Sequence, residues 1–163
     1  MDGRFYFGFG FDVHPLIQGR KLYIGGVLIP FEKGALGHSD GDALLHALID
    51  ASLSAAGYPD IGSLFPDQDP KYKDIPSTAL LEETIKLLSK KQFRFYQVDL
   101  TMVLDEPKIS PYYAKIKENL GILLKLPEER IGLKARRSEG VIFQKDKPAI
   151  ASFALVVLEK TSK

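Results

Sequence analysis

The sequence predicts an α/β fold (α+β) in which helices cover one face of a β-sheet, a two-layer arrangement of the ferredoxin-like type. Segments with the apolar pattern of strands are interleaved along the chain with segments of helical period. The 163 residues contain no internal repeat, low-complexity stretch or linker, and they suffice to bury a core. We therefore expect a single domain over residues 1–163.

The chain begins with two regions of strand character. Residues 5–13 are rich in aromatic side chains and predict a strand. Residues 21–29 contain Gly25 and Gly26 at their centre and are followed by a proline. Glycines inside a strand pattern mark a turn or a bend, so this region predicts a short hairpin or a bent edge strand.

A helical period follows. Residues 40–56 predict an amphipathic helix, which Ser39 or Asp40 can cap at its start and Gly57 can end. Residues 58–76 carry four prolines and predict an irregular loop. A loop of this length in a compact domain is usually functional or mobile.

The second half alternates between the two periods. The sequence predicts a helix over 77–90, a strand over 93–104, a helix from Ser110-Pro111 to about 125, and strands over 131–135 and 149–158. The last strand is apolar on both faces, unlike a strand with one solvated face. Because a two-layer domain leaves one sheet face uncovered, we expect that face to be buried against other subunits in a closed oligomer.

Composition excludes several classes of protein. The net charge is +1, so no global basic field indicates nucleic acid as a partner. No apolar run is long enough to span a bilayer, and the N-terminus lacks the pattern of a secretory signal, so we expect no membrane partner and a cytoplasmic location. Cysteine is absent, so any metal must be held by nitrogen and oxygen ligands.

One pattern indicates such a metal site. Asp12 and His14 are two residues apart on a predicted strand and therefore share a face, and His46 on the following helix can supply a third ligand. One carboxylate and two imidazoles with an open fourth position are the ligand set of a catalytic zinc site. The alternative is a half-buried helix histidine beside two polar strand-end residues. Asp50, one turn beyond His46, either orients that imidazole or is solvated.

Five motifs in this order resemble the 2-C-methyl-D-erythritol 2,4-cyclodiphosphate synthase family, an enzyme family of the non-mevalonate route to isoprenoid precursors. They are GFDVH at 10–14, GGVLIP at 25–30, HSDGD at 38–42 followed by His46, DIGSLFPD at 60–67, and PKI at 107–109. The resemblance implies a homotrimer of α/β subunits with three active sites at subunit interfaces. It also implies a phosphorus–oxygen lyase reaction in which the 2-phosphate of 4-diphosphocytidyl-2-C-methyl-D-erythritol 2-phosphate attacks the β-phosphorus and CMP leaves.

The resemblance also implies roles for individual residues. Asp12, His14 and His46 would bind zinc, and Glu139 would bind a second divalent ion, Mg²⁺ or Mn²⁺. His38 would stabilise the transition state. The residues implied to contact the substrate, including its cytidine diphosphate part, are Asp12, His14, His38, Ser39, Asp60, Ile61, Gly62, Phe65, Pro66, Asp67, Lys108, Ala135, Arg136, Arg137, Ser138, Glu139 and Phe143.

The chain departs from the family pattern in two places. A run of threonines usually precedes the glutamate, but here the sequence is Arg136-Arg137-Ser138-Glu139, with Arg137 at the position of a transition-state threonine. An arginine can clamp a phosphate more strongly than a hydroxyl can, so we expect Arg137 to be catalytic. The alternative is that these arginines point to solvent and that the site is degraded. Phe143 is kept, but Asp146 and Pro148 replace the Arg and Glu that line the central trimer cavity in many members.

Two other functions fit parts of the sequence. A zinc-dependent phosphoesterase would use water as nucleophile and needs a general base, for which Asp60 is the obvious candidate. A nucleotide sensor built on the same fold would bind CMP or CDP without turnover. Product analysis separates these alternatives from the cyclodiphosphate synthase.

Overall fold

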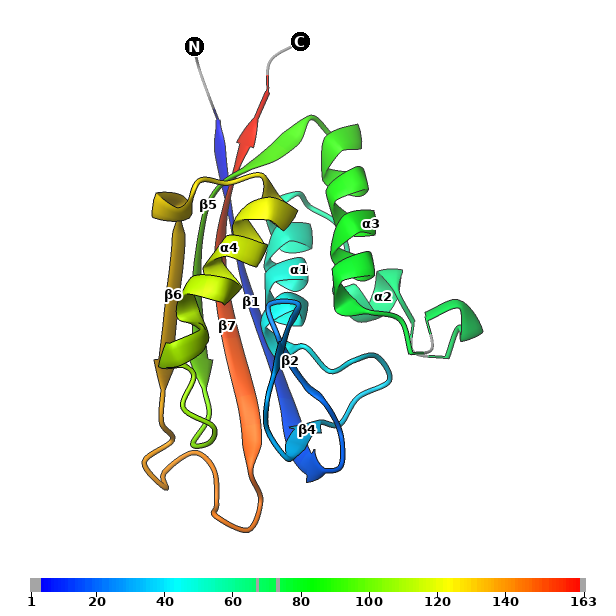
Figure 1. Cartoon of the computed structure of the whole chain (residues 1–163). Helices are drawn as coiled ribbons and strands as arrows, with labels where there is room; N and C mark the ends of the chain where they lie inside the picture. Colours follow the sequence, from blue (N-terminus) through cyan, green and yellow to red (C-terminus); the bar gives the residue numbers. More distant parts are fainter. Residues whose placement is uncertain (1–3, 67, 73, 162–163) are drawn as a thin grey trace.

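A computed structural model describes residues 4–66, 68–72 and 74–161 of the chain. A five-stranded sheet has the order β4-β1-β7-β5-β6 (Figure 1). Its strands are β1 (Phe5–Gln18), β4 (Lys33–Ala35), β5 (Phe93–Val103), β6 (Ile131–Arg136) and β7 (Ala149–Lys160). The central strand β7 runs antiparallel to both β1 and β5, whereas β6 runs parallel to β5. A separate hairpin is formed by β2 (Leu22–Ile24) and β3 (Val27–Ile29).

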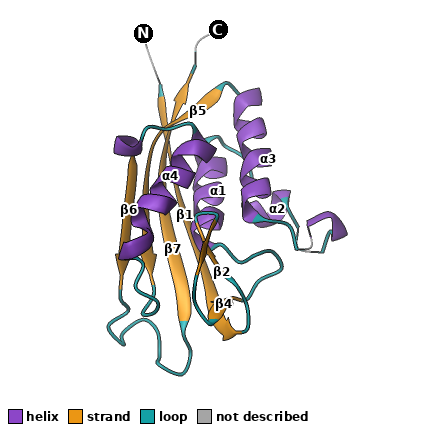
Figure 2. Cartoon of the chain, viewed as in Figure 1, coloured by secondary structure: helices purple, strands orange, loops and turns teal. Residues whose placement is uncertain are grey.

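Helices cover one face of this sheet (Figures 1 and 2). The main helices are α1 (Ala43–Ala55), α3 (Ser77–Lys90) and α4 (Tyr113–Leu124), and α2 is a single turn at Ile61–Leu64. Three 3₁₀ turns complete the set: η1 (Pro70–Tyr72), η2 (Ser110–Tyr112) and η3 (Glu128–Arg130). No helix in the described part of the chain has both the length and the apolar character required to cross a bilayer.

The arrangement confirms the predicted mixture of strands and helices and the single helical layer. Strand β1 continues five residues beyond the predicted end at residue 13, because it pairs with β7 as far as Pro15 and with β4 over its last three residues. Strand β4 was not predicted, since three residues carry too little pattern. The predicted loop over 58–76 contains α2 and η1.

The predicted helix caps are partly wrong. Asp42, not Ser39 or Asp40, is the N-cap of α1, and its buried carboxylate accepts hydrogen bonds from the backbone N–H groups of Leu45, Gly25 and Gly26. It therefore fastens the β2–β3 hairpin to the start of α1. Gly57 follows the end of α1 with a positive φ, as predicted. Ser110 does not cap α4 but begins the 3₁₀ turn η2.

Helix α1 packs on β1 at unusually short range. Gly8 and Gly10 lie on the face of β1 that meets the helix, on the same side as Asp12 and His14. A Cβ atom on Gly8 would lie 1.9 Å from the carbonyl oxygen of Ala51, and one on Gly10 would lie 2.0 Å from that of Ala47. Only glycine permits this approach, which brings the helix backbone against the strand.

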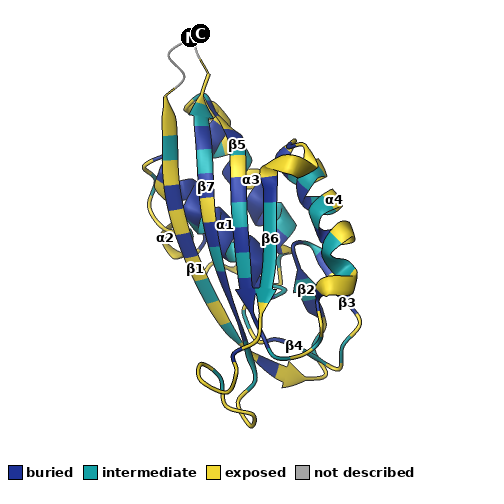
Figure 3. Ribbon diagram, turned by 90° about the vertical axis from the view of Figure 1, so that its left-hand side faces the viewer, coloured by how far each residue is buried: buried dark blue, intermediate teal, exposed yellow. Residues whose placement is uncertain are grey.

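On the opposite face of the sheet, the part formed by β1 and β7 is apolar, and along β1 it is exposed (Figure 3). The part formed by β5 and β6 is polar and includes the ion pair between Asp99 and Lys134. The outward side chains of β1 are aromatic or aliphatic, and Leu155 on β7 is also exposed. The exposed large apolar side chains on β1 are Phe5, Phe7, Phe9, Phe11, Val13 and Ile17, with Phe7 67% exposed. The expectation that the last strand is apolar on both faces is therefore confirmed for β7, and in the single chain nothing among the described residues covers the apolar outer side of β1.

We expect Gly10→Ala to lower the free energy of unfolding by about 1–3 kcal/mol, the usual cost of overpacking a close contact. The added methyl collides with the Ala47 carbonyl and must push α1 away from β1. Chemical denaturation measures the change. Gly62→Ala is the matched control, because its Cβ would meet nothing closer than 3.8 Å and it lies in an exposed helical turn. Equal stability of Gly10→Ala and the wild type would contradict the packing.

Candidate active site

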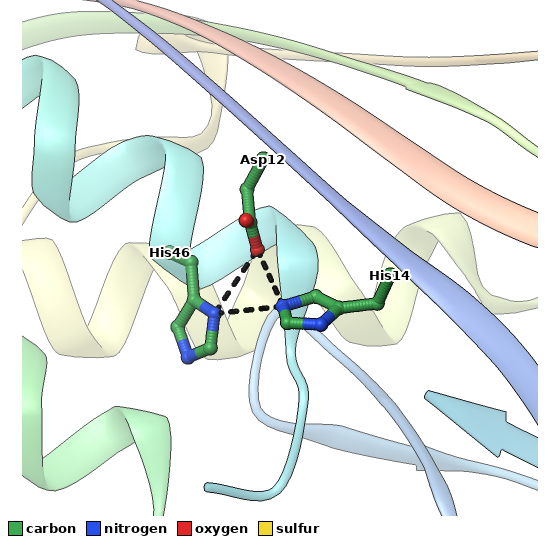
Figure 4. Close-up of side chains that lie close together, drawn as sticks. All are labelled: Asp12, His14 and His46. Carbon is green, nitrogen blue, oxygen red and sulfur yellow. Dashed lines mark hydrogen bonds and ion pairs between the residues drawn. The ribbon is translucent and has the colours of Figure 1, made fainter. Parts of the chain in front are cut away.

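Three side chains from two elements converge at one point (Figure 4). Asp12 and His14 extend from β1, and His46 extends from the second turn of α1. Asp12 Oδ2 lies 2.8 Å from His14 Nε2 and 3.0 Å from His46 Nδ1, and the two imidazole nitrogens are 3.2 Å apart. All three residues are half-buried. Among the described residues this is the only group of three or more His, Asp or Glu side chains close enough to share a metal ion.

The geometry of this triad fits a tetrahedral metal ion. Zinc bonds of about 2.0–2.1 Å to nitrogen or oxygen place two tetrahedral ligands roughly 3.3 Å apart. The three ligand atoms are separated by 2.8, 3.0 and 3.2 Å, so small movements suffice to seat an ion between them. Three protein ligands leave one position open, as in catalytic zinc sites.

In each imidazole, the ring nitrogen that points away from the triad has a hydrogen-bond partner. The nitrogen that points into the triad is therefore the one available to a metal. His14 Nδ1 lies 2.8 Å from the carbonyl oxygen of Leu36 and must donate to it, because a carbonyl only accepts. His14 Nε2 is therefore left for a metal. His46 Nε2 lies 2.9 Å from the hydroxyl of Ser77 and 3.1 Å from that of Ser39.

The charges of the triad are coupled. Burial alone would raise the pKa of Asp12, but hydrogen bonds from His14 and His46 hold it well below its ordinary value. The hydrogen bond to Asp12 raises the pKa of His14, and burial opposes this shift. Asp12 is therefore an ionised carboxylate at neutral pH. A cation is the natural occupant of the space between these three groups.

A cavity of about 210 Å³ opens beside the triad. The sequence-predicted residues that line it, besides the triad itself, are His38, Ser39, Ile61, Gly62 and Phe65. His38 and Ser39 lie on the loop before α1, whereas the others belong to α2 and the residue that follows it. The structure thus brings together residues from four separate parts of the sequence. Asp67 lies outside the described residues, and Pro66 is exposed and does not line the cavity.

Two acidic residues are engaged elsewhere. The carboxylate of Asp50 accepts the backbone N–H of Ile61 at 3.1 Å, so it fixes the start of α2 instead of orienting His46. Asp60 is the N-cap of α2, and its carboxylate accepts the N–H of Ser63 at 2.7 Å. Hydrogen bonding to Ser63 holds the pKa of Asp60 below its ordinary value, and Asp60 does not line the cavity.

The remaining sequence-predicted residues gather at the end of β6 and in the loops that follow β5 and β6. Lys108, Ala135, Arg136 and Arg137 line one cavity at the carboxyl ends of β5 and β6. Arg137 also lines a second cavity, of about 410 Å³, together with Glu139 and Phe143. Neither cavity shares a lining residue with the cavity beside the triad.

Asp105 fixes the conformation of this second group. Its carboxylate accepts the Ser138 N–H at 2.8 Å and the Ser138 hydroxyl at 2.5 Å, and Ser138 is buried. Arg137 and Glu139 flank the buried serine and are exposed. Ser138 is thus an anchor in this chain, and its two neighbours are exposed on either side of it.

Comparisons with known proteins agree with the geometry. The sequence profile of the YgbB family matches residues 5–159. The chain belongs to the YgbB family. It is 47% identical over 154 residues to the 2-C-methyl-D-erythritol 2,4-cyclodiphosphate synthase of Caldicellulosiruptor bescii, which covers 94% of this chain and 98% of the relative. The enzyme of the same name from Enterococcus faecalis is 45% identical over 153 residues, with coverage of 94% and 98%.

Solved structures give the same result for the fold. A 2C-methyl-D-erythritol-2,4-cyclodiphosphate synthase in a form with bound CDP superposes on this YgbB-family chain with a TM-score of 0.87. The two are 43% identical, and the match covers 93% of this chain and 99% of that one. The mixed α/β fold predicted from the sequence is therefore confirmed.

Sequence reasoning missed several residues that build the site of this YgbB-family protein. Ser77 and Asp105 carried no signal, because a serine at a helix start and an acidic residue after a strand are common surface features. Arg20 donates to the Ser39 carbonyl at 3.0 Å and steadies the loop before α1, but it comes from a turn that no motif covers. Gly8 and Gly10 form only a Gly-x-Gly pattern, which is too common to predict a close helix–strand contact.

Proposed function

We propose that this chain converts 4-diphosphocytidyl-2-C-methyl-D-erythritol 2-phosphate to 2-C-methyl-D-erythritol 2,4-cyclodiphosphate with release of CMP. The supporting observation is the convergence of Asp12, His14 and His46 in a chain whose relatives, matched over nearly their whole length, are named for that product. The enzyme is then a lyase that forms a cyclic isoprenoid precursor. Incubation with the cytidylylated substrate and identification of both products tests the proposal directly.

Asp12 Oδ2, His14 Nε2 and His46 Nδ1 would hold a zinc ion or a similar divalent metal. When bound, the ion supplies Lewis acidity to a phosphate oxygen at its open position. The Leu36 carbonyl keeps the proton of His14 on Nδ1, and thereby orients this ring toward the ion. Both ligand-bearing elements belong to the core, so the site is formed before substrate arrives.

The cavity beside the triad would hold the methylerythritol diphosphate part of the substrate. His38 and Ser39 line it from the loop before α1, where the helix N-terminus adds partial positive charge for a phosphate. His38 would stabilise the transition state as a hydrogen-bond donor. Ile61, Gly62 and Phe65 form the opposite wall, with α2 held in place by Asp50 and Asp60.

The reaction requires little proton transfer to or from side chains of the protein. An oxygen of the 2-phosphate forms a bond to the β-phosphorus, the bond from that phosphorus to the oxygen bridging toward the α-phosphate breaks, and CMP leaves as a stable anion. The attacking phosphate is already ionised at neutral pH. Catalysis therefore rests on holding the two phosphates in line and on neutralising their charge.

The cytidine part would bind at an interface between subunits. Within one chain, Lys108 and the residues after β6 line cavities separate from the triad's cavity, so one chain does not bring the two halves of the site together. A homotrimer would join the triad of one subunit to the 104–110 segment of its neighbour. The exposed apolar sheet face supplies a surface for such an assembly.

Arg136, Arg137 and Glu139 would act on the diphosphate from this second half. Glu139 would bind a second divalent ion, Mg²⁺ or Mn²⁺, through a hard oxygen ligand. Arg137 replaces a hydroxyl with a permanent positive charge, and the anchoring of Ser138 by Asp105 fixes the segment that carries it. We infer that Arg137 neutralises charge that develops on the transferred phosphoryl group.

The phosphoesterase alternative needs a general base, and its candidate, Asp60, is poorly suited to that role. Asp60 caps α2, accepts the Ser63 N–H and has a lowered pKa, so it is a poor acceptor for a proton of water. Asp60 also does not line the cavity beside the triad. Cyclisation needs no such base, and it therefore fits the site better than hydrolysis does.

His46→Ala should remove bound zinc and abolish turnover while leaving the fold largely intact, because it deletes one of three ligands and only a half-buried side chain. Metal analysis, circular dichroism and product assay give the three readouts. His38→Ala is the control, since it should keep zinc and still lose turnover. Normal turnover of metal-free His46→Ala would contradict the ligand set.

Arg137→Ala should lower kcat by about a hundredfold with a smaller change in KM, because the lost charge acts on the transition state. Arg137→Lys keeps the charge and should retain more of kcat than the alanine variant. Steady-state kinetics with the cytidylylated substrate measure both. An unchanged kcat in Arg137→Ala would show that this arginine is not catalytic.

Phe9→Glu should shift the protein from trimer toward monomer, since each buried Phe contributes about 1.5–3 kcal/mol to association. Phe9 is 62% exposed in the single chain and lies on the outer sheet face, near the middle of the row of exposed apolar side chains on β1. Sedimentation velocity measures the species. Ile122→Glu, at a 70% exposed position on α4 away from this face, should leave the trimer intact. A monomeric wild type would refute the assembly.

A further inference from the structure

Ser77 contacts the metal triad from a third element. It is the first residue of α3, is fully buried, and places its hydroxyl 2.9 Å from His46 Nε2. The same hydroxyl makes a very short hydrogen bond to Asp40 Oδ1, and the Ser77 backbone N–H donates to Asp40 Oδ2 at 3.0 Å. The contacts therefore run from Asp40 to Ser77, and from Ser77 to the triad residue His46.

The direction of each hydrogen bond in this chain of contacts is fixed by chemistry. A carboxylate only accepts, so the single hydrogen of the Ser77 hydroxyl points to Asp40. The hydroxyl then offers only a lone pair to His46, and His46 must donate its Nε2–H to it. With a hydrogen held on Nε2, only Nδ1 can become a metal ligand. Nδ1 lies 3.0 Å from Asp12 Oδ2, so a metal bound there would replace the hydrogen that Nδ1 donates to this carboxylate in the metal-free protein.

Ser39 cannot impose the same direction. Its hydroxyl lies 3.1 Å from His46 Nε2 and accepts the Gly41 backbone N–H at 3.3 Å. Its own hydrogen has no carboxylate partner among the contacts of the described residues, so it can donate to His46 or turn away. Ser77 is therefore the residue whose bonding discriminates between the two tautomers of His46.

Asp40 is itself held rigidly. Its carboxylate accepts both groups of Ser77 and also the backbone N–H of Asp42 at 3.2 Å. The N-cap residue of helix α3 is Pro76, whose side chain cannot accept a hydrogen bond. Asp40, on the loop before α1, serves instead as the acceptor for the first N–H of the helix. The position of Ser77 is thus set by two elements at once.

We propose that Ser77, oriented by Asp40, is a positioning residue that commits Nδ1 of His46 to metal binding. The inference rests on the metal centre of the proposed function, and it adds a residue outside the triad that orients one of the metal ligands. The hydroxyl holds the imidazole in the tautomer and rotation that metal binding requires, and does not touch the metal or the substrate. Loss of such a partner typically weakens metal affinity by about ten- to a hundredfold.

The test compares three variants with the wild type. Ser77→Ala removes the acceptor but leaves the backbone N–H that Asp40 binds, so the start of α3 keeps its anchor. Ser77→Thr keeps a hydroxyl at the same position. Ser52→Ala is the matched control, because Ser52 is also fully buried on a helix and donates its hydroxyl to the Leu48 carbonyl, away from the triad.

Zinc affinity is measured by competition with a chromophoric chelator at fixed pH. We expect Ser77→Ala to bind zinc about ten- to a hundredfold more weakly, Ser77→Thr to recover most of the loss, and Ser52→Ala to match the wild type in zinc affinity despite its lost hydrogen bond. Equal zinc affinity of Ser77→Ala and the wild type would overturn the inference alone. A wild type that binds no zinc would overturn both the inference and the metal centre.

Nuclear magnetic resonance of the zinc-loaded protein gives a second readout that a purely structural role would not produce. Long-range ¹H–¹⁵N correlations of His46 should show the hydrogen on Nε2 and the metal on Nδ1 in the wild type. In Ser77→Ala the Nε2 hydrogen should exchange faster with solvent, since its buried acceptor is gone. Coordination through Nε2 in the wild type would refute the proposal.

Discussion

The close approach of α1 to β1 is the constraint on which the site depends. Asp12 and His14 are fixed on the strand, and His46 reaches them only because the helix backbone lies almost against the strand at Gly8 and Gly10. A Cβ atom at either glycine would collide with a carbonyl oxygen of the helix, so α1 would have to move away from the strand and carry His46 with it. The packing of the core and the placement of the ligands are therefore one and the same feature.

Acidic side chains tie this central pair of elements to the rest of the protein. Asp42 joins the β2–β3 hairpin to α1, Asp50 joins α2 to α1, and Asp40 joins α3 to the loop before α1. Each accepts backbone N–H groups that would otherwise lack partners. The β2–β3 hairpin, α2 and α3 are in this way fastened to α1 or to the loop before it. These contacts fix the positions of the elements that form the walls of the cavity.

Much of this was predictable from the sequence, and the rest was not for physical reasons. The spacing of Asp12 and His14 gave their common face, and the helical period placed His46 opposite them. The N-cap of α1 was misassigned because Ser39, Asp40 and Asp42 are all good caps, and only the tertiary contacts with Gly25 and Gly26 select Asp42. Asp50 was similarly ambiguous until the fold brought Ile61 to it.

Ser77 occupies two roles whose energetics are linked. It opens the first turn of α3 and also accepts the hydrogen of His46, so local unfolding of that turn removes the partner that orients the imidazole. By reciprocity, an ion that favours the ordered imidazole also protects the backbone amides of the turn against exchange with solvent. Metal affinity and the free energy of local unfolding at the start of α3 are therefore coupled, and a change in one changes the other.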